Sequence, residues 1–311
     1  MKPTDIYAHI AQNNRKIVGL ILLFPVALMV FVYAFFLLLA GLEKRPFDQS
    51  IQQYNEVFTI VIPVILVVCA VLTLFSLSCG DKMMLKFAGA SVCPNDSEHL
   101  SVYRMVENIA LKAGIPTPEV YLIPDESLNA FATGYSPEKA SVALTTGIIK
   151  KLEPLELEGV ISHEIGHIIN RDIRLNMFII TGIGIVATIG EILARSSGRR
   201  RSSSKKGGGG ILVMIGLALL LFRYVIAPFI HMALSRSQEF QADATGAYLT
   251  RHPLALARAL KKIAVDPRVE ALDSSAQMAC ACIYNPLKKI GGLLDTHPPI
   301  EERIKRLESM I

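Results

Sequence analysis

Two histidines and a glutamate stand in the stretch His163-Glu-Ile-Gly-His167, and their spacing could hold a metal ion. On a helix, side chains at positions i and i+4 project from one face a turn apart, so both imidazoles can reach one zinc ion about 2.0 Å from each nitrogen. Glu164, next to the first histidine, could take a proton from the water that zinc activates and return it to the leaving amine. The pattern predicts an endopeptidase with one zinc ion per chain.

The residues around this motif have the apolar spacing of a helix. Residues 153–170 place valine and isoleucine side chains on one face, and Pro154 stands near the first turn. By chance, the five-residue motif would occur on the order of once in a hundred chains of this length. We therefore expect a helix that presents both histidines from one face.

A catalytic zinc ion needs a third protein ligand and an open position. Four acidic residues after the motif are candidates. Asp172 is too close along the chain to fold back onto the same metal, and Glu191 lies within an apolar run. Glu239 and Asp243 share one helix face a turn apart. One of these two carboxylates could bind the metal while the other orients a ligand histidine, and an ordinary exposed pair is the alternative.

The composition is too apolar for an ordinary soluble domain, because 51% of the 311 residues are hydrophobic and the mean hydropathy is +0.42. Charged residues, 19% of the chain, gather in separate stretches. This distribution indicates a protein with membrane and soluble parts. The net charge of +5 is concentrated in a few places, and no motif typical of nucleic-acid binding is present. We expect no nucleic-acid partner.

The cysteines show no disulfide framework, because their number is odd and their spacing is irregular. They are Cys69, Cys79, Cys93, Cys280 and Cys282. The last two have no second cysteine pair to complete a metal site, so we interpret them as small packing residues. A reducing compartment fits this usage.

At about 1.5 Å per residue, an apolar helix of about 20 residues crosses a bilayer core of roughly 30 Å. Candidate runs lie at residues 17–40, 58–77, 177–193 and 211–234. The last run is broken by Arg223 and Pro228. The first run lacks a cleavage pattern and is interpreted as an uncleaved anchor. The runs predict two membrane hairpins, one within residues 1–80 and one within residues 175–234.

Residues 81–174 and 235–311 alternate charged, apolar and turn-forming residues, which is typical of a soluble domain. Helical spacing covers residues 101–113. Short strands are expected at residues 119–123, 128–133 and 141–145. The sequence thus predicts a mostly α fold with a small β-sheet (α+β), in which four hydrophobic helices in two hairpins accompany a zincin-like catalytic domain in two parts.

Basic residues favour a cytoplasmic N-terminus. Lys2, Arg15 and Lys16 precede the first run, whereas the link between the first two runs mixes basic and acidic residues. A second hairpin would then bring both parts of the catalytic domain to the cytoplasmic side. The basic linker at residues 195–210 conflicts with this topology, because the same rule places it in the cytoplasm. Either the N-terminal signals dominate or the second hairpin enters the membrane only part-way.

Taken in order, the motifs resemble those of the HtpX heat-shock membrane proteases, which are relatives of the CAAX prenyl endopeptidases. The resemblance covers nearly the whole chain. It is carried by the two hairpins and by the segments His163-Glu-Ile-Gly-His, Asn170-Arg-Asp, Ser235-Arg-Ser-Gln-Glu-Phe-Gln-Ala-Asp-Ala and Thr296-His-Pro-Pro-Ile-Glu-Glu-Arg. The linker at residues 195–210 departs from the family pattern and leaves the site residues unaffected.

The resemblance implies several roles for residues outside the motif. Asn129, Ala130 and Phe131 would lie in an edge strand that binds the substrate backbone through main-chain hydrogen bonds. His297 occupies the position of a family histidine that stabilises the oxyanion. From the residues alone, His297 is equally well explained as part of the cap of the last helix. Arg303 is interpreted as a structural partner.

The resemblance also implies a gluzincin-like site with Glu239 as the third zinc ligand. It places the chain in the bacterial inner membrane, with the catalytic domain facing the cytoplasm. The expected function is quality control under stress, by cleavage of misfolded or damaged membrane proteins and unfolded polypeptides.

Two alternatives stay open. The same chemistry would serve a processing peptidase for one defined peptide, such as a lipidated tail. A zinc-stabilised membrane scaffold belongs to another class. Glu164 speaks against the scaffold, because a structural zinc site usually closes with four protein ligands and needs no general base.

Overall fold

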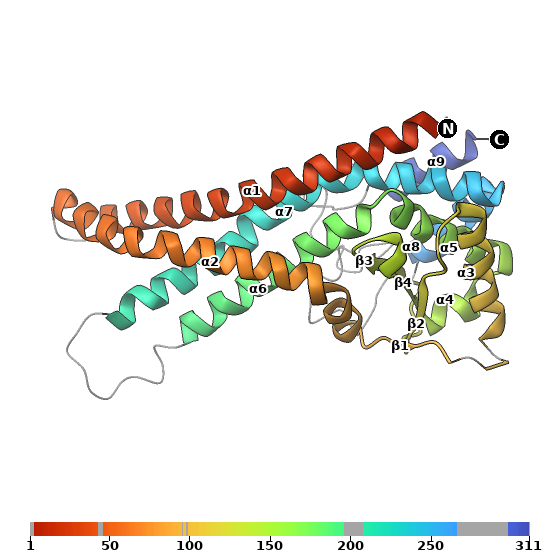
Figure 1. Ribbon diagram of the computed structural model, residues 1–311, viewed down its shortest axis with the longest axis horizontal. Coiled ribbons are helices and arrows are strands. Elements are labelled where there is room, and N and C mark those ends of the chain that lie inside the picture. The colour runs from red at the N-terminus through yellow and green to blue at the C-terminus, as the bar shows by residue number, and fades with distance from the viewer. Residues whose placement is uncertain are drawn as a thin grey trace. The chain divides into compact units, whose positions relative to one another are not determined.

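The computed structural model describes residues 3–42, 46–94, 96–97, 99–195, 208–265 and 298–310. The chain divides into two compact units, which we call the sheet unit and the apolar unit. The sheet unit comprises Met1–Arg15, Leu77–Thr181 and Phe229–Ile311, and the apolar unit comprises Lys16–Ser76 and Gly182–Pro228. The described residues are mostly helical with one small mixed sheet (Figure 1). The predicted mostly helical fold with a small sheet is confirmed.

Four long helices contain the predicted apolar runs. They are α1 (Pro3–Leu42), α2 (Phe47–Phe87), α6 (Asp172–Arg195) and α7 (Gly208–Thr250). Within the described residues, three segments are long and apolar enough to cross a membrane: Ile21–Leu42, Phe47–Phe87 and Asp172–Arg195. Among the residues of α7 whose side chains the structure describes, a shorter apolar segment lies at Leu212–Phe222. A full crossing by residues 211–234 therefore stays a prediction.

Helix α7 is longer than the sequence pattern indicates. Arg223 and Pro228 interrupt the fourth apolar run, yet the helix continues past both to Thr250. A proline inside a helix removes one backbone hydrogen bond, and neighbouring groups can replace that bond in a membrane helix. Glu239 consequently lies on the same helix as the fourth apolar run.

Aromatic side chains join α1 to α2 and α7 inside the apolar unit. The ring of Phe222 lies edge-on to Phe24 and Phe31, with centroid distances of 5.8 and 5.5 Å. Phe36 stacks on Tyr54 at a centroid distance of 5.2 Å. Each such pair contributes about 0.5–1.5 kcal/mol beyond the burial of its area.

Helices α6 and α7 approach closely in the same unit. A Cβ on Gly216 would lie 2.5 Å from the backbone nitrogen of Ala194, and one on Gly190 would lie 3.1 Å from the carbonyl oxygen of Gly216. Other faces of the unit expose apolar side chains such as Leu22 (66%) and Ile60 (70%). A lipid environment accounts for these exposed side chains, because extended apolar surfaces are rare on soluble monomers.

The sheet of the sheet unit has four strands. They are β1 (Ser91–Val92), β2 (Glu119–Ile123), β3 (Ala130–Gly134) and β4 (Ala140–Thr145). Their order is β1-β2-β4-β3, with β2 and β4 parallel and the two outer pairs antiparallel. The three predicted strands are confirmed as β2, β3 and β4, whereas β1 was not expected. In the described sheet β3 is an edge strand.

Helices and turns surround this sheet. They are α3 (Leu100–Ala113), η1 (Pro137–Lys139), α4 (Thr146–Lys151), α5 (Pro154–Ile169), α8 (Pro253–Val265) and α9 (Ile300–Glu308). Val142 and Leu144 of β4 pack with residues of α3 and α5 in the main core. Phe131 and Ala143 pack against Met84, near the end of α2, in a second cluster. Both faces of the sheet are thus covered, as the alternation of side chains along a strand requires.

Helix α5 confirms the helix predicted at residues 153–170. Its first turn is stabilised by a capping hydrogen bond, in which the N–H of Glu153 donates to the carboxylate of Glu156 at 3.0 Å. The Glu156 side chain is buried and accepts a hydrogen bond from Lys262 of α8 at 2.7 Å. These bonds hold the start of the histidine-bearing helix against α8.

Glycines allow α5 and α7 to approach closely. A Cβ on Gly166 would lie 3.1 Å from the carbonyl oxygen of Ala242, and one on Gly246 would lie 3.0 Å from the backbone nitrogen of His163. Backbones this close leave no room for larger residues in a packed interior. The contact brings Glu239, two turns before Gly246 on α7, towards the motif on α5.

Candidate active site

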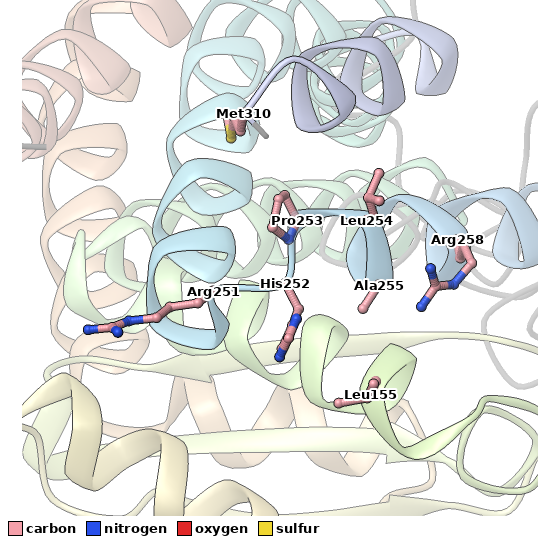
Figure 2. A pocket seen from close by; sticks show the side chains of 8 residues that line it. All are labelled: Leu155, Arg251, His252, Pro253, Leu254, Ala255, Arg258 and Met310. Atoms are coloured by element: carbon pink, nitrogen blue, oxygen red, sulfur yellow. The ribbon is translucent and has the colours of Figure 1, made fainter.

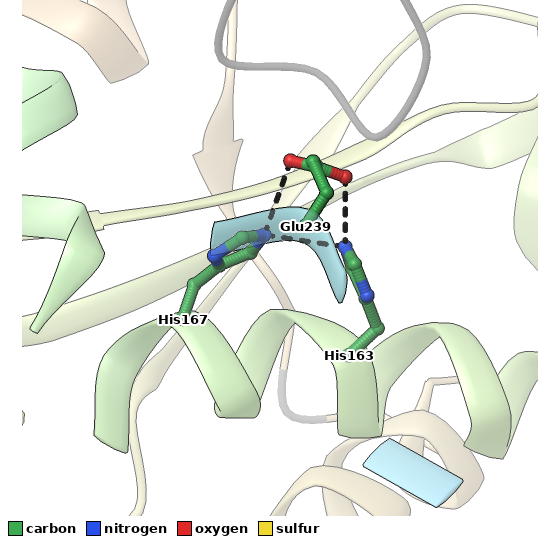
Figure 3. A group of neighbouring side chains, drawn as sticks. All are labelled: His163, His167 and Glu239. Carbon is green, nitrogen blue, oxygen red and sulfur yellow. Dashed lines mark hydrogen bonds and ion pairs between the residues drawn. The ribbon is translucent and has the colours of Figure 1, made fainter. Parts of the chain in front are cut away.

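The two motif histidines and Glu239 meet inside the sheet unit, as Figure 3 shows. His163 and His167 come from successive turns of α5, Glu239 comes from α7, and all three are buried. The Nε2 atoms of the histidines are 3.2 Å apart. The two carboxylate oxygens of Glu239 lie 3.7 Å from Nε2 of His163 and 3.6 Å from Nε2 of His167. The described residues contain no other such group that could hold a metal ion.

This geometry fits a zinc ion. Bonds of about 2.0–2.1 Å in a tetrahedron place two ligand atoms roughly 3.3 Å apart. The separation of 3.2 Å between the two Nε2 atoms matches that spacing, and each Nε2 atom has one of the two Glu239 oxygens at 3.6 or 3.7 Å. Two nitrogens and a carboxylate oxygen are also ligands that zinc accepts, and three protein ligands leave the fourth position open. The assignment of His163, His167 and Glu239 as ligands stays a prediction with suitable geometry.

Each histidine also has a carboxylate beside its second ring nitrogen. Nδ1 of His163 lies 2.9 Å from Oδ1 of Asp243, and Nδ1 of His167 lies 3.1 Å from Oδ2 of Asp172. A carboxylate at Nδ1 fixes the proton on that nitrogen and leaves Nε2 free to bind a metal. Asp243 therefore lies where its predicted orienting role requires, and Asp172 has the same relationship to the other histidine.

Electrostatics set the pKa of His167. Burial lowers the pKa, but the hydrogen bond to Asp172 and the charges of Glu239, Asp172 and Glu164 outweigh burial and raise it to about 9. Without a metal, this imidazole holds a proton at neutral pH. A metal ion at Nε2 would have to displace that proton.

Glu164 is 2% exposed and adjoins His163 on α5. Burial raises the pKa of its carboxyl group, against the opposing charges of the two histidines. The carboxylate also accepts a hydrogen bond from the backbone N–H of Ala132 in β3. A carboxyl group that is buried, oriented and next to the histidines has the properties of a general base.

Arg303 of α9 neutralises the acidic residues of the site. Its side chain is 1% exposed. Nη2 and Nε lie 2.7 and 2.8 Å from the two carboxylate oxygens of Asp243, and Nη1 lies 2.9 Å from Oε2 of Glu239. Although burial raises the pKa of an isolated carboxyl group, the charge of Arg303 holds the pKa of Asp243 below its usual value. The last described helix thus contributes directly to the site.

Strand β3 presents one edge to Glu164. The carbonyl of Asn129 accepts from the N–H of Thr145 in β4, whereas the N–H of Ala132 reaches Glu164. The N–H of Ala130 donates to the Asn129 side chain at 2.9 Å. Alternation along the strand therefore directs the main-chain groups of Ala130 and Ala132 away from β4. Phe131 is buried in the second core cluster, and substrate binding by these residues stays a prediction.

Two residues of the site were not recognised from the sequence in their present roles. Asp172 was rejected as a ligand because it follows His167 too closely, but that short separation is what lets it bind Nδ1. Arg303 was expected to be a structural partner, and no local pattern connects it to Glu239, 64 positions earlier. In the sequence, only the segment Asn170-Arg-Asp pointed to Asp172, and only the segment Thr296-His-Pro-Pro-Ile-Glu-Glu-Arg pointed to Arg303. His297 lies outside the described residues, and its oxyanion role stays a prediction.

A separate pocket of about 340 Å³ lies at the opposite end of α5 (Figure 2). Its lining is Leu155, Arg251, His252, Pro253, Leu254, Ala255, Arg258 and Met310. Leu155 precedes His163 by two helical turns, or about 12 Å along the axis. The pocket contributes no residue to the metal cluster.

Comparison with known proteins identifies the class. Residues 96–311 match peptidase family M48. The "Protease HtpX homolog" of Dictyoglomus thermophilum is 35% identical over 311 residues, which cover 100% of this chain and 96% of the relative. The homolog of Caldanaerobacter subterraneus subsp. tengcongensis is 41% identical over 237 residues, 74% of this chain and 78% of the relative.

The "Protease HtpX homolog" of Listeria monocytogenes serotype 4a is 46% identical over 219 residues, 66% of this chain and 72% of the relative. A crystal structure of S. mikatae Ste24p is similar with a TM-score of 0.44 and 20% identity. The similar region covers 96% of this chain and 66% of that chain.

The chain belongs to peptidase family M48. It is a membrane metalloprotease and hydrolyses peptide bonds. The apolar helices and the relatives together make it a multi-pass integral membrane protein. The predicted resemblance to the HtpX proteases is confirmed.

Proposed function

We propose that zinc is the metal of this protease, held by His163, His167 and Glu239, with Glu164 as the general base. The observation that carries the proposal is the convergence of two Nε2 atoms and one carboxylate at separations of 3.2 to 3.7 Å. When bound, zinc would lower the pKa of a water molecule and polarise the substrate carbonyl.

Glu164 supplies the proton transfers. It takes a proton from the attacking water and returns it to the leaving amine. A pKa raised by burial suits this role, because a group that must accept and donate protons works best with a pKa close to the operating pH. The N–H of Ala132 fixes the direction of the carboxylate.

Asp172, Asp243 and Arg303 prepare the ligands. The two aspartates hold the histidine rings through Nδ1. Arg303 fixes the carboxylates of Asp243 and Glu239 at 2.7 to 2.9 Å. The ligands are thus oriented before a metal arrives, which reduces the ordering that binding requires.

The substrate strand lies along the free edge of β3, opposite Asn129, Ala130 and Phe131. Main-chain hydrogen bonds hold an extended peptide with little dependence on its sequence. A protease of this kind cleaves unfolded segments of many proteins. The exposed apolar helices support substrates from the membrane, and misfolded or damaged membrane proteins are the proposed class.

The proposed location is the bacterial inner membrane, with the catalytic residues on the cytoplasmic side. Support comes from Lys2, Arg15 and Lys16 before the first apolar run. The relatives named "Protease HtpX homolog" are bacterial proteins, which supports a bacterial membrane as the location.

Cleavage of an unfolded model protein in detergent tests the mechanism. Zinc-loaded wild type is compared with Glu164→Gln, and bound zinc is measured in both. We expect the variant to keep its zinc and to lose at least about a thousandfold in kcat, within the range for removal of a central catalytic group. Retention of cleavage by a zinc-loaded Glu164→Gln protein would exclude Glu164 as the base.

Mapping the cleavage products separates the broad protease from a dedicated processing peptidase. Dispersed cuts in several unrelated unfolded proteins support quality control, whereas a single cut in one defined peptide supports processing. A scaffold is disfavoured, because the described cluster offers three ligands and a buried base rather than four ligands.

A further inference from the structure

The end of β3 has a conformation that only glycine adopts without strain. Gly134 has φ +132°, and a Cβ there would lie 2.2 Å from the carbonyl oxygen of Lys139. The chain consequently turns at this residue, and Tyr135 leaves the sheet with 37% of its surface exposed. The free edge of β3 is thus continued by an exposed aromatic ring.

Arg174 covers that ring. It lies in the first turn of α6, within the sheet unit and before the apolar run of that helix. Its guanidinium carbon lies 4.0 Å from the centroid of the Tyr135 ring, and its Nε donates to the carbonyl of Tyr135 at 2.8 Å. These two contacts fix the plane of the guanidinium and leave its terminal N–H groups available. Among the described residues, Arg174 forms no ion pair within 4 Å.

The surroundings of Arg174 have a surplus of positive charge. Arg171 is close enough to act electrostatically on Arg174. The nearby carboxylate is that of Glu138, which is fully exposed. A hydrogen bond from Ser136 lowers the pKa of Glu138, and the charges of Arg171 and Arg174 lower it further. The field at this place therefore favours a negative group.

The position of Tyr135 along the chain limits its distance from Glu164. The N–H of Ala132 binds Glu164, and Tyr135 follows three residues later. Three residues of fully extended chain would span about 10 Å, and the turn after Gly134 makes this value an upper limit. A peptide paired with β3, with its scissile bond at Glu164, would bring a side chain near Tyr135 two to four residues from that bond.

We propose that Arg174, stacked on Tyr135, forms a subsite for an acidic side chain of the substrate, two to four residues from the scissile bond. The inference rests on the proposed function, because it requires substrate to lie along β3. A guanidinium with fixed plane and free N–H groups binds a carboxylate through two hydrogen bonds. The protease would thus prefer an acidic residue at one substrate position, while main-chain hydrogen bonds bind the rest of the peptide independently of its sequence.

Peptides that differ at one position test the subsite. A cleavable unfolded peptide is made with Glu, Gln or Lys at each of the four positions on either side of its cut. Wild type, Arg174→Gln and Arg174→Glu are compared, with Arg104→Gln on the exposed face of α3 as the matched control. The readouts are the values of kcat/KM for the Glu peptide and for the Lys peptide, each divided by the value for the Gln peptide.

For wild type and Arg104→Gln, we expect kcat/KM to be about tenfold higher with Glu than with Gln at one position two to four residues from the cut. A factor of this size lies between the effect of an exposed ion pair and that of a buried charged hydrogen bond. In Arg174→Gln the ratio falls to about one. In Arg174→Glu the preference reverses towards Lys. Binding of the same peptides to Glu164→Gln protein, measured by fluorescence anisotropy, should show the same order.

Three results would overturn the subsite. The first is a wild-type kcat/KM that does not depend on the residue at any position, and the second is a preference for Glu that survives in Arg174→Gln. The third is an equal loss of kcat/KM for every peptide in Arg174→Gln, which would show that Arg174 only supports the end of β3. An arginine in the first turn of an apolar helix, in contact with a tyrosine, also occurs at membrane surfaces, and a flat profile would favour that role. If zinc-loaded wild type cleaves no peptide at all, the proposed function fails first.

Discussion

Oδ2 of Asp172 lies 3.1 Å from Nδ1 of His167, although only four residues separate the two in the chain. Helix α5 ends at Ile169, and Arg171 adopts a left-handed conformation with φ 61°. The reversal starts α6 at Asp172 and turns its carboxylate back onto the imidazole. The relationship gives His167 the same kind of support that Asp243 gives His163.

Asp172→Asn should weaken metal binding without removing a ligand. The amide keeps the shape of the side chain but lacks the charge that makes the imidazole more basic, and loss of such a partner typically costs about 10- to 100-fold in metal affinity. Competition with a chelator of known zinc affinity measures the effect. Glu107→Gln, an exposed change on α3, is the control and should leave the affinity unchanged. Equal affinities for Asp172→Asn and wild type would show that the contact is dispensable.

Arg303→Met should destabilise the metal-free protein strongly. The change leaves the buried carboxylates of Asp243 and Glu239 without their cation, and breaking a buried ion pair from one side costs about 3–5 kcal/mol. Arg306→Met on the same helix is the matched control. Arg306 is exposed, stacks on Phe240 and pairs with Glu302, so its loss should cost about 1 kcal/mol or less.

Thermal unfolding in detergent, with and without zinc, measures both changes. Zinc should recover part of the stability lost in Arg303→Met, because a ligand that binds only the folded state stabilises that state. A midpoint for Arg303→Met equal to that of Arg306→Met would contradict the role of Arg303.

The stability of the metal-free protein should fall as the pH rises from about 6.5 to about 9. The pKa of His167 is raised from 6.5 to about 9 in the folded protein, so proton binding stabilises the fold below 6.5 and this contribution is lost above 9. The pKa of Glu164 is also raised, so its protonation adds stability that is lost as the pH rises through that raised pKa. The lowered pKa of Asp243 adds nothing in this interval, because its contribution changes only at acidic pH.

Zinc affinity should change in the opposite sense. The metal displaces a proton from His167, so the apparent affinity should rise about tenfold per pH unit up to about pH 9. Zinc titrations at several pH values, beside melting curves of the metal-free protein, test both slopes. A metal-free protein that gains stability between pH 6.5 and 9 would contradict the assigned protonation.

Gly246→Ala should push α7 away from α5. The added Cβ would lie 3.0 Å from the backbone nitrogen and 3.2 Å from Cα of His163, and backbone atoms cannot move aside as a flexible side chain can. Overpacking of this kind costs about 1–3 kcal/mol, and the displacement should also weaken zinc binding. Gly182→Ala has open space around its Cβ and should be neutral or stabilising by up to about 1 kcal/mol. Unchanged zinc affinity in Gly246→Ala would show that the contact does not position Glu239.

Much of the secondary structure could be predicted because its signals are local. The alternation and flanking turn residues of β2, β3 and β4 lie within each strand, and the apolar spacing of α5 lies within that helix. Strand β1 was missed, because its two residues carry no pattern and are ordered by pairing with Leu122 and Tyr121 of β2. The full length of α7 was not predicted: the apolar run ends at Leu234, but the helix continues to Thr250 as an amphipathic segment whose change in composition carries no stop signal.

The motif alone determined which atoms could hold a metal, because i and i+4 spacing on a helix fixes the relative positions of His163 and His167. It also determined that Glu164 adjoins them. Only the tertiary structure decided how Glu239, Asp172 and Arg303 reach the same place. Their positions depend on a chain reversal, on glycine contacts between helices and on the need of buried carboxylates for a cation. These effects act between residues that are distant in sequence or separated by a turn, and no local pattern encodes them.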